Sequence, residues 1–486
     1  MPETILDLHG VSFCYPSYPG LKSVPVLNGL ELSLAEGELG LVLGRPEEGK
    51  TTLAKLIVGL LPRFGGGRLE GDIRLQGRSI LPDKPFELLE RVGLVFQNPD
   101  EQLFTTRCDT EVAFALESLG LPGGAIRKRT QEALGEMGLA ALRDEAPGSL
   151  SGGEKKKLLL ACLAALDPPL WLLDETLEEL DAQAKVSILN YLKKKGTTGL
   201  IFSAKWHELF RTEVSRIFML RGGRIEEIVA QPGSARFRDL LLRQGLLLAR
   251  RPGGGGSTPG GPDTPLLEAV DLSFHYPEQE RFSLSVERLA FHAGELTALT
   301  GENGSGKSTL ARLLCGLLVP ESGRVSIFKQ GRRFQAGAED LQRFTGYMFQ
   351  NPDYQLFLPT VREELAYGLK LQRRGPVEIG RLVAEAIALF KLPAPEAPPA
   401  LLGYGARKRL QAAVCYHLAR SLLILDEGDS GLSVEDFASL LELFASPTRA
   451  ILIITHDLTL AEAFAHKILT LEGGRIAAVR PGKGRG

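Results

Sequence analysis

Features typical of secreted, metal-binding or membrane-spanning chains are scarce in this sequence. Its five cysteines are scattered through 486 residues without a C-x-x-C pair, which favours a reducing compartment and argues against a zinc or iron–sulfur site. No apolar stretch reaches the roughly 18 residues that span a bilayer. The best candidate, Leu158 to Leu166, is stopped by Asp167 and two prolines. The opening residues also lack the basic start and apolar run of a signal peptide, so we expect membrane work only through docking onto other subunits.

An excess of charge of one sign is lacking as well. The chain has 57 basic and 59 acidic side chains, and its formal net charge is −2. This balance argues against a nucleic-acid partner held by a basic surface. The length suggests about two to four domains, each large enough to bury its own core.

A glycine-rich phosphate-binding pattern occurs twice. Residues 301–308 read Gly-Glu-Asn-Gly-Ser-Gly-Lys-Ser, a full match to G-x-x-x-x-G-K-[ST]. Residues 44–51 read Gly-Arg-Pro-Glu-Glu-Gly-Lys-Thr, with Glu47 where the usual pattern has glycine. Backbone N–H groups of such a loop surround phosphate oxygens, its lysine reaches the β and γ phosphates, and its hydroxyl binds Mg²⁺. The sequence therefore predicts two nucleotide sites that differ from each other.

The two copies belong to a repeat that covers almost the whole chain. Matching residues keep a nearly constant separation, as in the pairs Tyr15 and Tyr276, Lys50 and Lys307, Gln97 and Gln350, and Asp174 and Asp426. Residues 251–262 between the copies are rich in Gly and Pro and cannot pack a core. We expect a first domain at 1–248, a flexible linker at 249–265 and a second domain at 266–486.

The order of patterns within each half predicts an α/β domain. Each opens with a β-rich segment, at 6–13 and 267–274, followed by a short apolar strand, the phosphate loop and a helix whose positive N-terminus faces phosphate. Later apolar runs at 170–173 and 422–425 end in Asp-Glu and read as buried parallel strands that open onto the site. Helical stretches near 110–150 and 362–400 predict an inserted subdomain.

The ordered motifs resemble the ATPase domains of ABC transporters. The phosphate loop is followed by Gln97 or Gln350, by Leu-Ser-Gly-Gly-Glu at 150–154, by Asp-Glu, and by His456. The segments at 95–104 and 348–357, each containing Asn-Pro-Asp-x-Gln-Leu-Phe, resemble the ATPases of energy-coupling factor importers, as do those at 111–117 and 364–369. The resemblance implies two tandem P-loop NTPase domains. Each would have a mostly parallel sheet core, an antiparallel β subdomain and an inserted helical subdomain.

In that family two domains pair and enclose two nucleotides, and each site takes its signature and D-loop from the opposite domain. The resemblance implies one competent site with Lys307, Gln350, Glu427 and His456 as catalytic residues. Lys307 would hold phosphate, Glu427 would polarise the attacking water and His456 would contact the γ phosphate. Its ATP-binding residues would be Tyr276, Gly301, Asn303, Gly304, Ser305, Gly306, Lys307, Ser308, Thr309, Ser151, Gly152, Gly153, Glu154 and Asp181. Mg²⁺ would be placed by Ser308, Gln350 and Asp426.

The other site is expected to be degenerate. Ala204 stands opposite His456, with His207 a poor substitute, and the opposing signature reads Leu-Gly-Tyr-Gly-Ala at 402–406. The opposing D-loop at 430–433 has lost its aspartate. The residues of this site would be Tyr15, Gly44, Gly49, Lys50, Thr51, Thr52, Gln97, Asp174, Glu175, Ala204, Gly403 and Gly405, with Thr51, Gln97 and Asp174 toward the metal. Glu175 could be an inherited residue with no turnover to perform.

The implied function is to power import of a vitamin or a transition metal ion. The resemblance implies ATP as substrate, a transmembrane coupling subunit and a substrate-capturing membrane subunit as partners, and a place on the cytoplasmic face of the membrane. Two alternatives stay open, the tandem ATPase of a sugar importer and a soluble tandem ABC protein acting on ribosomes. The basic clusters at 155–157 and 407–409 are interpreted as solvated helix faces.

Overall fold

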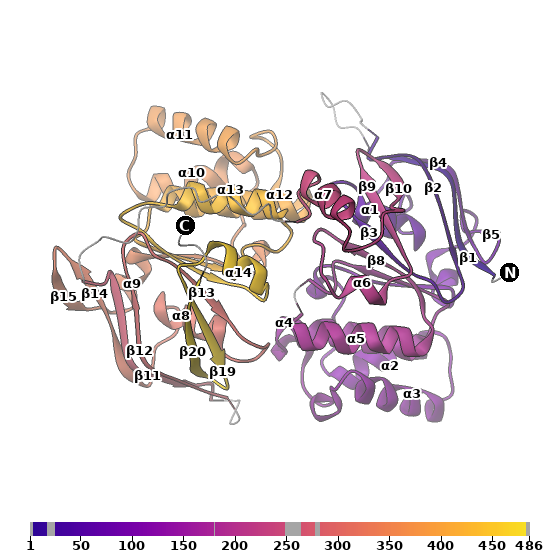
Figure 1. Cartoon of the computed structure of the whole chain (residues 1–486), viewed down its shortest axis with the longest axis horizontal. Helices are drawn as coiled ribbons and strands as arrows, with labels where there is room; N and C mark the ends of the chain where they lie inside the picture. The colour runs from indigo at the N-terminus through magenta and orange to yellow at the C-terminus, as the bar shows by residue number, and fades with distance from the viewer. Residues whose placement is uncertain (1–2, 17–24, 179, 248–263, 278–281, 483–486) are drawn as a thin grey trace. The chain divides into compact units, whose positions relative to one another are not determined.

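The computed structural model describes residues 3–16, 25–178, 180–247, 264–277 and 282–482 (Figure 1). The chain divides into two compact units, Met1–Leu248 and Ala249–Gly486. Nearly all of the predicted linker at 249–265 lies outside the described residues.

The first domain contains two sheets. Its antiparallel sheet has the order β2-β1-β4-β5 and its larger, mostly parallel sheet the order β10-β9-β3-β8-β7-β6. The strands are β1 (Thr4–Cys14), β2 (Leu27–Ala35), β3 (Leu39–Leu43), β4 (Arg68–Leu75), β5 (Arg78–Ser79), β6 (Val92–Val95), β7 (Leu170–Asp174), β8 (Thr198–Ser203), β9 (Arg216–Arg221) and β10 (Arg224–Glu227). The helices are α1 (Lys50–Ile57), α2 (Cys108–Ser118), α3 (Gly123–Glu136), α4 (Gly152–Leu166), α5 (Ala182–Lys195), α6 (Phe210–Glu213) and α7 (Ala235–Arg243).

The second domain repeats this topology. Its sheets have the orders β12-β11-β14-β15 and β16-β17-β18-β13-β19-β20. The strands are β11 (Leu267–His275), β12 (Ser283–Phe291), β13 (Leu296–Thr300), β14 (Ser322–Lys329), β15 (Arg332–Gln335), β16 (Thr345–Met348), β17 (Leu422–Asp426), β18 (Ala450–Ile454), β19 (Lys467–Glu472) and β20 (Arg475–Pro481). The helices are α8 (Lys307–Leu314), α9 (Ala338–Phe344), α10 (Val361–Leu371), α11 (Pro376–Leu389), α12 (Tyr404–Leu418), α13 (Val434–Phe444) and α14 (Leu458–Phe464).

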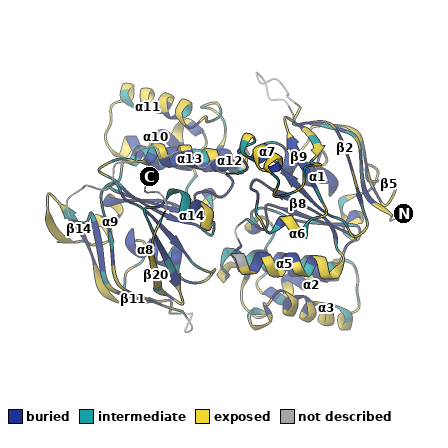
Figure 2. Cartoon of the chain, in the orientation of Figure 1, coloured by how far each residue is buried: buried dark blue, intermediate teal, exposed yellow. Residues whose placement is uncertain are grey.

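The central strands are buried along their whole length. Every residue of β3, β7, β17 and β18 is buried, which explains their continuous apolar runs (Figure 2). Each domain has one apolar core that includes the central sheet and the helical subdomain, and a second between the central sheet and the antiparallel sheet. In Figure 1 the helices α2 and α3, like α10 and α11, lie away from the antiparallel sheet of their own domain. The predicted fold class is confirmed.

The carboxyl ends of the parallel strands carry the predicted site residues. The loop after β3 or β13 is the phosphate loop, and the loop after β6 or β16 contains Gln97 or Gln350. The strands β7 and β17 end at Asp174 and Asp426. These strands run parallel in one sheet, with β8 between β3 and β7 and β18 between β13 and β17. Their carboxyl ends therefore lie along one edge of each sheet.

Candidate nucleotide-binding sites

Both phosphate loops place their lysine in the same way. In the second domain, Lys307 Nζ donates to the carbonyl oxygens of Gly301 at 2.9 Å and Glu302 at 2.8 Å. In the first, Lys50 Nζ donates to Gly44 O at 2.8 Å and Arg45 O at 2.9 Å. Each ammonium group therefore lies within its own loop, at the N-terminus of α8 or α1, where a phosphate would find both positive charge and free N–H groups.

The second loop offers side-chain donors that the first lacks. The Nδ2 of Asn303 and the Oγ of Ser305 are buried without a hydrogen-bond partner. The matching residues of the first loop are Pro46 and Glu48, and Glu48 Oε2 instead accepts a hydrogen bond from Gly222 N at 2.6 Å. Unsatisfied donors favour an anion, whereas a carboxylate does not. The loop of the second domain is therefore the better phosphate site.

Glu47 adopts a backbone conformation that suits glycine. Its φ is 67°, close to the 77° of Gly304 at the matching position. The Glu47 side chain is exposed, and a Cβ added at Gly304 would meet no atom within 4 Å. The left-handed conformation costs about 1–2 kcal/mol for a residue with a side chain. Because water and salt screen an exposed charge, we attribute the effect of Glu47 mainly to the backbone.

Three loops of the second domain converge on Glu427. Its Oε2 accepts a hydrogen bond from Gln350 Nε2 at 2.8 Å, and His456 Nε2 lies 3.3 Å from its Oε1. The Glu427 backbone has a φ of 47°, an unusual value for a non-glycine residue and one often found where a side chain is held for function. The structure thus brings together the predicted glutamine, glutamate and histidine of this domain.

In the first domain the matching glutamate has no histidine beside it. Glu175 Oε2 accepts from Gln97 Nε2 at 2.8 Å, and its Oε1 forms an ion pair with Lys50 Nζ at 3.1 Å. The position of His456 is taken by Ala204, which is fully buried. The Nε2 of His207 is buried without a hydrogen-bond partner, and burial lowers the pKa of this imidazole well below its ordinary value. The low pKa favours the neutral form of His207, and no contact of its ring with Glu175 replaces the missing histidine among the described residues.

A carboxylate that the sequence analysis missed lies beside Ala204. Glu178 Oε1 accepts hydrogen bonds from Ala204 N at 2.7 Å and from Ser203 Oγ at 3.0 Å. Burial, and then the charge of Glu175, raise the pKa of Glu178 to about 7, while Lys205 opposes the rise. The repeat could have revealed this residue, because Glu178 stands at the position that Ser430 occupies in the second copy. This acidic side chain contacts the first-domain segment that matches the histidine loop of the second domain.

Each domain has one buried aspartate suited to a divalent cation. In the first, neither carboxylate oxygen of Asp174 has a hydrogen bond of normal geometry. Burial raises the pKa of Asp174, and the neighbouring Thr51 hydroxyl and Lys50 ammonium oppose the rise. In the second, Asp426 Oδ2 accepts a hydrogen bond from Tyr347 at 2.5 Å. Among the described residues no group of three His, Cys, Asp or Glu could hold a metal by itself. A single carboxylate plus a loop hydroxyl suits Mg²⁺ that arrives with phosphate oxygens.

The two signature segments differ at their helix N-termini. Ser151 caps α4 and its Oγ donates to Glu154 Oε2 at 2.7 Å, while the same carboxylate accepts from Ser151 N at 2.9 Å. Gly403 gives α12 no side-chain cap. The next residue, Tyr404, donates its hydroxyl to Gln350 O at 3.1 Å within its own domain. The intact signature is thus preorganised around Gly152 and Gly153, and the altered one contacts its own glutamine loop.

The expected solvation of the two basic clusters is wrong for their central residues. Lys156 and Lys408 are fully buried. Lys156 Nζ lies 3.4 Å from Glu175 O, and Lys408 Nζ lies 3.1 Å from Phe349 O and 3.4 Å from Glu427 O. These lysines connect the signature helix of each domain to the backbone of its glutamate and glutamine loops. Helical periodicity could have predicted this burial. In a helix packed on one side, one of three consecutive residues such as 155–157 or 407–409 faces the core.

The remaining predicted residues lie at helix starts near the loops. Asp181 caps α5 by accepting from Ala184 N at 2.7 Å, and Ser433 caps α13 by accepting from Asp436 N at 3.0 Å. Ser433 therefore caps its helix as Asp181 does, but it does not carry the negative charge of an aspartate. The hydroxyl groups of Tyr15 and Tyr276 lie 3.1 Å and 3.2 Å from the Oγ1 atoms of Thr52 and Thr309, respectively. Each ring thus stands beside the helix that follows its phosphate loop.

The Asn-Pro-Asp-x-Gln segments build ordered loops that present an aromatic side chain. In the first, Gln102 Oε1 accepts from Phe96 N at 2.8 Å, and Thr105 N donates to Glu111 Oε2 at 2.8 Å. In the second, Glu364 accepts from the backbone N–H groups of Phe357 and Leu358. Glu111 and Glu364 are buried, whereas Phe104 and Phe357 are 64% and 68% exposed. The segments therefore fix exposed rings rather than catalytic groups.

No helix in the described part of the chain is long and apolar enough to cross a membrane. Two phosphate loops at the carboxyl ends of parallel strands, each with a glutamine and an Asp-Glu pair, define a tandem nucleotide-binding protein of the P-loop class.

Comparison with known proteins narrows this class. The ABC transporter family model matches residues 27–178 and 284–430. A protein of Methanosarcina mazei, named among ABC transporter ATP-binding proteins, is 32% identical over 97% of this chain and 94% of its own length. One from Methanosarcina acetivorans is 31% identical over 97% and 89%. The structure of cbiO1 from Clostridium perfringens, described as part of the ABC transporter complex cbiONQ, is 27% identical over 46% of this chain and 89% of its own, with a TM-score of 0.40. The chain belongs to the ABC transporter family and is an ATPase with two ABC domains.

Proposed function

We propose that this chain powers import of a micronutrient, a vitamin or a transition metal ion, through partner membrane subunits, with one competent and one degenerate ATP site. The observation that carries the asymmetry is the set of contacts at Glu427. In the second domain Gln350 and His456 contact this glutamate, whereas Glu175 is contacted by Gln97 and has Ala204 in place of the histidine. An imidazole beside the glutamate supports its role as general base, and the first domain has an alanine at that position.

The competent site combines the second domain's phosphate loop with the first domain's signature. Lys307, Asn303 and Ser305 bind the phosphates, Glu427 polarises the attacking water, and His456 contacts the γ phosphate. Tyr276 stacks on the adenine. The signature residues Ser151, Gly152, Gly153 and Glu154, with Asp181 of the D-loop, come from the first domain. The capping box at Ser151 supports this role, because it holds the helix N-terminus ready for an anion.

The degenerate site combines the first domain's phosphate loop with the altered signature around Gly403 and Gly405. It keeps Lys50, Thr51 and Asp174, so it retains groups that bind nucleotide. It lacks the histidine and the side-chain donors of its counterpart, and Tyr404 is hydrogen-bonded to Gln350 O in its own domain. We infer that this site holds nucleotide without rapid turnover.

Mg²⁺ accompanies the nucleotide in both sites. Ser308, Asp426 and Gln350 would hold it in the second domain, and Thr51, Asp174 and Gln97 in the first. The buried Asp174 carboxylate without a normal hydrogen bond supports this assignment. When bound, the ion neutralises charge on the phosphate oxygens.

The membrane partners dock on the exposed aromatic pairs. Phe104 packs edge-on against Phe114 at 4.7 Å between ring centroids, and Phe357 against Tyr367 at 5.5 Å. These rings occupy matching positions in the two domains and follow the loops of Gln97 and Gln350. Rigidly held, exposed aromatic rings are typical anchors of a protein interface. We therefore place the chain at the cytoplasmic face of the membrane, against a transmembrane coupling subunit that works with a substrate-capturing subunit.

Fractionation of tagged chain from its native cells tests the importer against its alternatives. The proposal predicts recovery with integral membrane subunits and transport of a vitamin or metal ion by the purified complex. Recovery with ribosomes would favour the soluble alternative, and transport of a sugar would favour the other importer class.

A further inference from the structure

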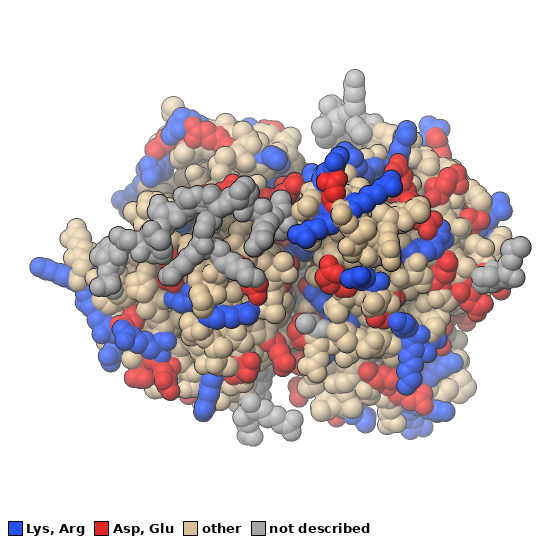
Figure 3. Space-filling model, viewed as in Figure 1, with Lys and Arg blue, Asp and Glu red and all other residues tan. Residues whose placement is uncertain are grey.

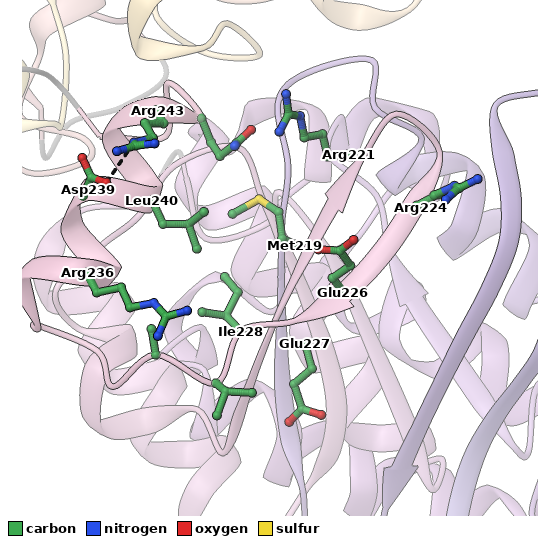
Figure 4. Close-up of a pocket in the computed structure, with 13 residues that line it drawn as sticks. Met219, Arg221, Arg224, Glu226, Glu227, Ile228, Arg236, Asp239, Leu240 and Arg243 are labelled. Atoms are coloured by element: carbon green, nitrogen blue, oxygen red, sulfur yellow. Dashed lines mark ion pairs between the residues drawn. The ribbon is translucent and has the colours of Figure 1, made fainter.

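A cavity of about 600 Å³ lies in the first domain between the β9–β10 hairpin and α7 (Figure 4). It has the size of a small-molecule site. It belongs to neither nucleotide site. We propose that this cavity binds a small organic phosphate and that its occupancy is coupled to the first domain's phosphate loop. This inference stands apart from the transport role.

Unpaired arginines surround the cavity. Arg221 and Arg224 lie on the hairpin side and Arg236 on α7. None of these three side chains has an ion-pair or hydrogen-bond partner in the described part of the chain. Two further pairs are already neutralised, Arg243 with Asp239 at 2.8 Å and Glu227 with Arg216 at 2.6 Å.

Glu226 is the one lining carboxylate without a described partner, so the unpaired lining charge is positive. In Figure 3 basic side chains gather over the part of the first domain where Figure 1 labels α7 and β10.

The floor of the cavity is apolar. Met219, Ile228 and Leu240 line it, and Figure 4 shows these side chains between the arginines of the hairpin and those of the helix. The guanidinium group presents a planar set of donors that matches phosphate oxygens. An apolar floor with arginines at two sides therefore suits a phosphate that carries a short organic group, and a bare ion would leave the floor uncovered.

The end of α7 touches the degenerate nucleotide site. Gln244 lines the cavity, and its carbonyl oxygen accepts a hydrogen bond from Arg45 Nε at 2.6 Å. The carbonyl oxygen of Arg45 in turn accepts from Lys50 Nζ at 2.9 Å. One end of a helix thus contacts both the cavity and the phosphate loop.

The same helix contacts the segment that replaces the histidine loop. Trp206 N donates to Leu246 O at 3.2 Å, and the Trp206 ring packs on Phe237 of α7 with 4.7 Å between centroids. A ligand that shifts α7 changes both the loop of Lys50 and the surroundings of Ala204. By thermodynamic reciprocity, nucleotide in the first site also changes the affinity of the cavity for its ligand.

The second domain offers a matched control. Arg475 occupies the position of Arg224 after a Gly-Gly turn, but Glu472 stands where the first domain has Arg221. No helix equivalent to α7 follows β20 among the described residues. A ligand held by the cavity must therefore depend on the arginines of the first domain alone.

Calorimetric titration of the full chain with n-butyl phosphate tests the binding site. We expect saturable binding that is tighter than that of inorganic phosphate and that weakens about tenfold or more in Arg221→Ala and in Arg236→Ala. Arg475→Ala should bind like the wild type. Unchanged affinity in both first-domain variants, or an equal loss in Arg475→Ala, would overturn the site. Equal affinity for inorganic phosphate would overturn the role of the apolar floor.

A binding experiment with lipid vesicles distinguishes a soluble organic phosphate from a lipid headgroup as the ligand. If the chain binds phosphatidylglycerol vesicles through Arg221 and Arg236 but does not bind n-butyl phosphate, the surface is a membrane contact and the proposal fails.

Fluorescence emission from Trp206 tests the coupling between the cavity and the first nucleotide site. The chain has two tryptophans, so Trp171→Phe leaves Trp206 alone. Saturating n-butyl phosphate should shift its emission, and Arg236→Ala should abolish the shift. Binding without any shift would overturn the coupling.

Discussion

His456 Nε2 lies 3.3 Å from Glu427 Oε1 in the second domain, and the matching position of the first domain holds the buried Ala204. The two domains share a topology, so this contact separates them chemically rather than architecturally. The glutamate of the first domain, Glu175, is contacted by Gln97 as Glu427 is by Gln350, but it has no histidine at this position.

The histidine contact should be needed for turnover. His456→Ala removes the imidazole beside Glu427, and we expect ATP hydrolysis to fall by about 10²-fold or more. His207→Ala is the matched control in the first domain, because the His207 ring packs on Phe210. Steady-state phosphate release from the purified chain measures both. Equal losses in the two variants would contradict the assignment.

The side-chain donors of the second loop should set nucleotide affinity. Ser305→Ala and Asn303→Ala each remove a buried donor, and we expect binding of a fluorescent, non-hydrolysable ATP analogue to weaken about tenfold. The reciprocal change Glu48→Ser in the first loop replaces an acceptor by a donor and should tighten binding at that site. If neither direction of exchange alters affinity, the loops do not differ in the way described.

The exposed aromatic rings should serve docking and not catalysis. Phe104→Ala and Phe357→Ala should leave hydrolysis by the isolated chain unchanged, because the rings do not contact Glu427 or the phosphate loops. They should reduce co-purification with membrane subunits. Glu111→Gln should do the same less strongly, since Glu111 holds the loop that carries Phe104. Exposed Val229 supplies a control, and Val229→Ala should retain the partners.

Glu178 should make stability depend on pH. Burial and the charge of Glu175 raise its pKa from 4.5 to about 7, against the opposing charges of Lys205 and Lys50. Between those two values the folded protein keeps a proton that the unfolded chain has lost, so the free energy of unfolding falls as pH rises through this window. Glu178→Gln cannot ionise but keeps an oxygen that accepts from Ala204 N.

Thermal melts at about pH 5 and about pH 8 measure this effect. The melting temperature of Glu178→Gln relative to the wild type should rise between the two conditions. Melting temperatures that move in parallel would show that Glu178 does not titrate in this window.

The strands and helices of the fold could be predicted from the sequence because they depend on local residue patterns. The buried run Leu39–Leu43 forms β3 with those bounds, since a strand covered on both faces needs an apolar residue at every position. Lys156 and Glu178 were missed because their burial depends on tertiary packing. A lysine between two lysines resembles a solvated face until the helix is packed, and an acidic residue after Asp-Glu has no motif of its own. The α7 cavity was missed because it depends on a helix without a repeat partner.

Single Glu-to-Gln changes test the central claim most directly. ATP turnover of the full chain is measured for Glu427→Gln and for Glu175→Gln, with binding of a non-hydrolysable analogue as the check that both variants are folded. Glu427→Gln should abolish hydrolysis, because it removes the base that Gln350 and His456 hold, while Glu175→Gln should leave most of it intact. Loss of turnover in Glu175→Gln with retention in Glu427→Gln would contradict the assignment of the competent site.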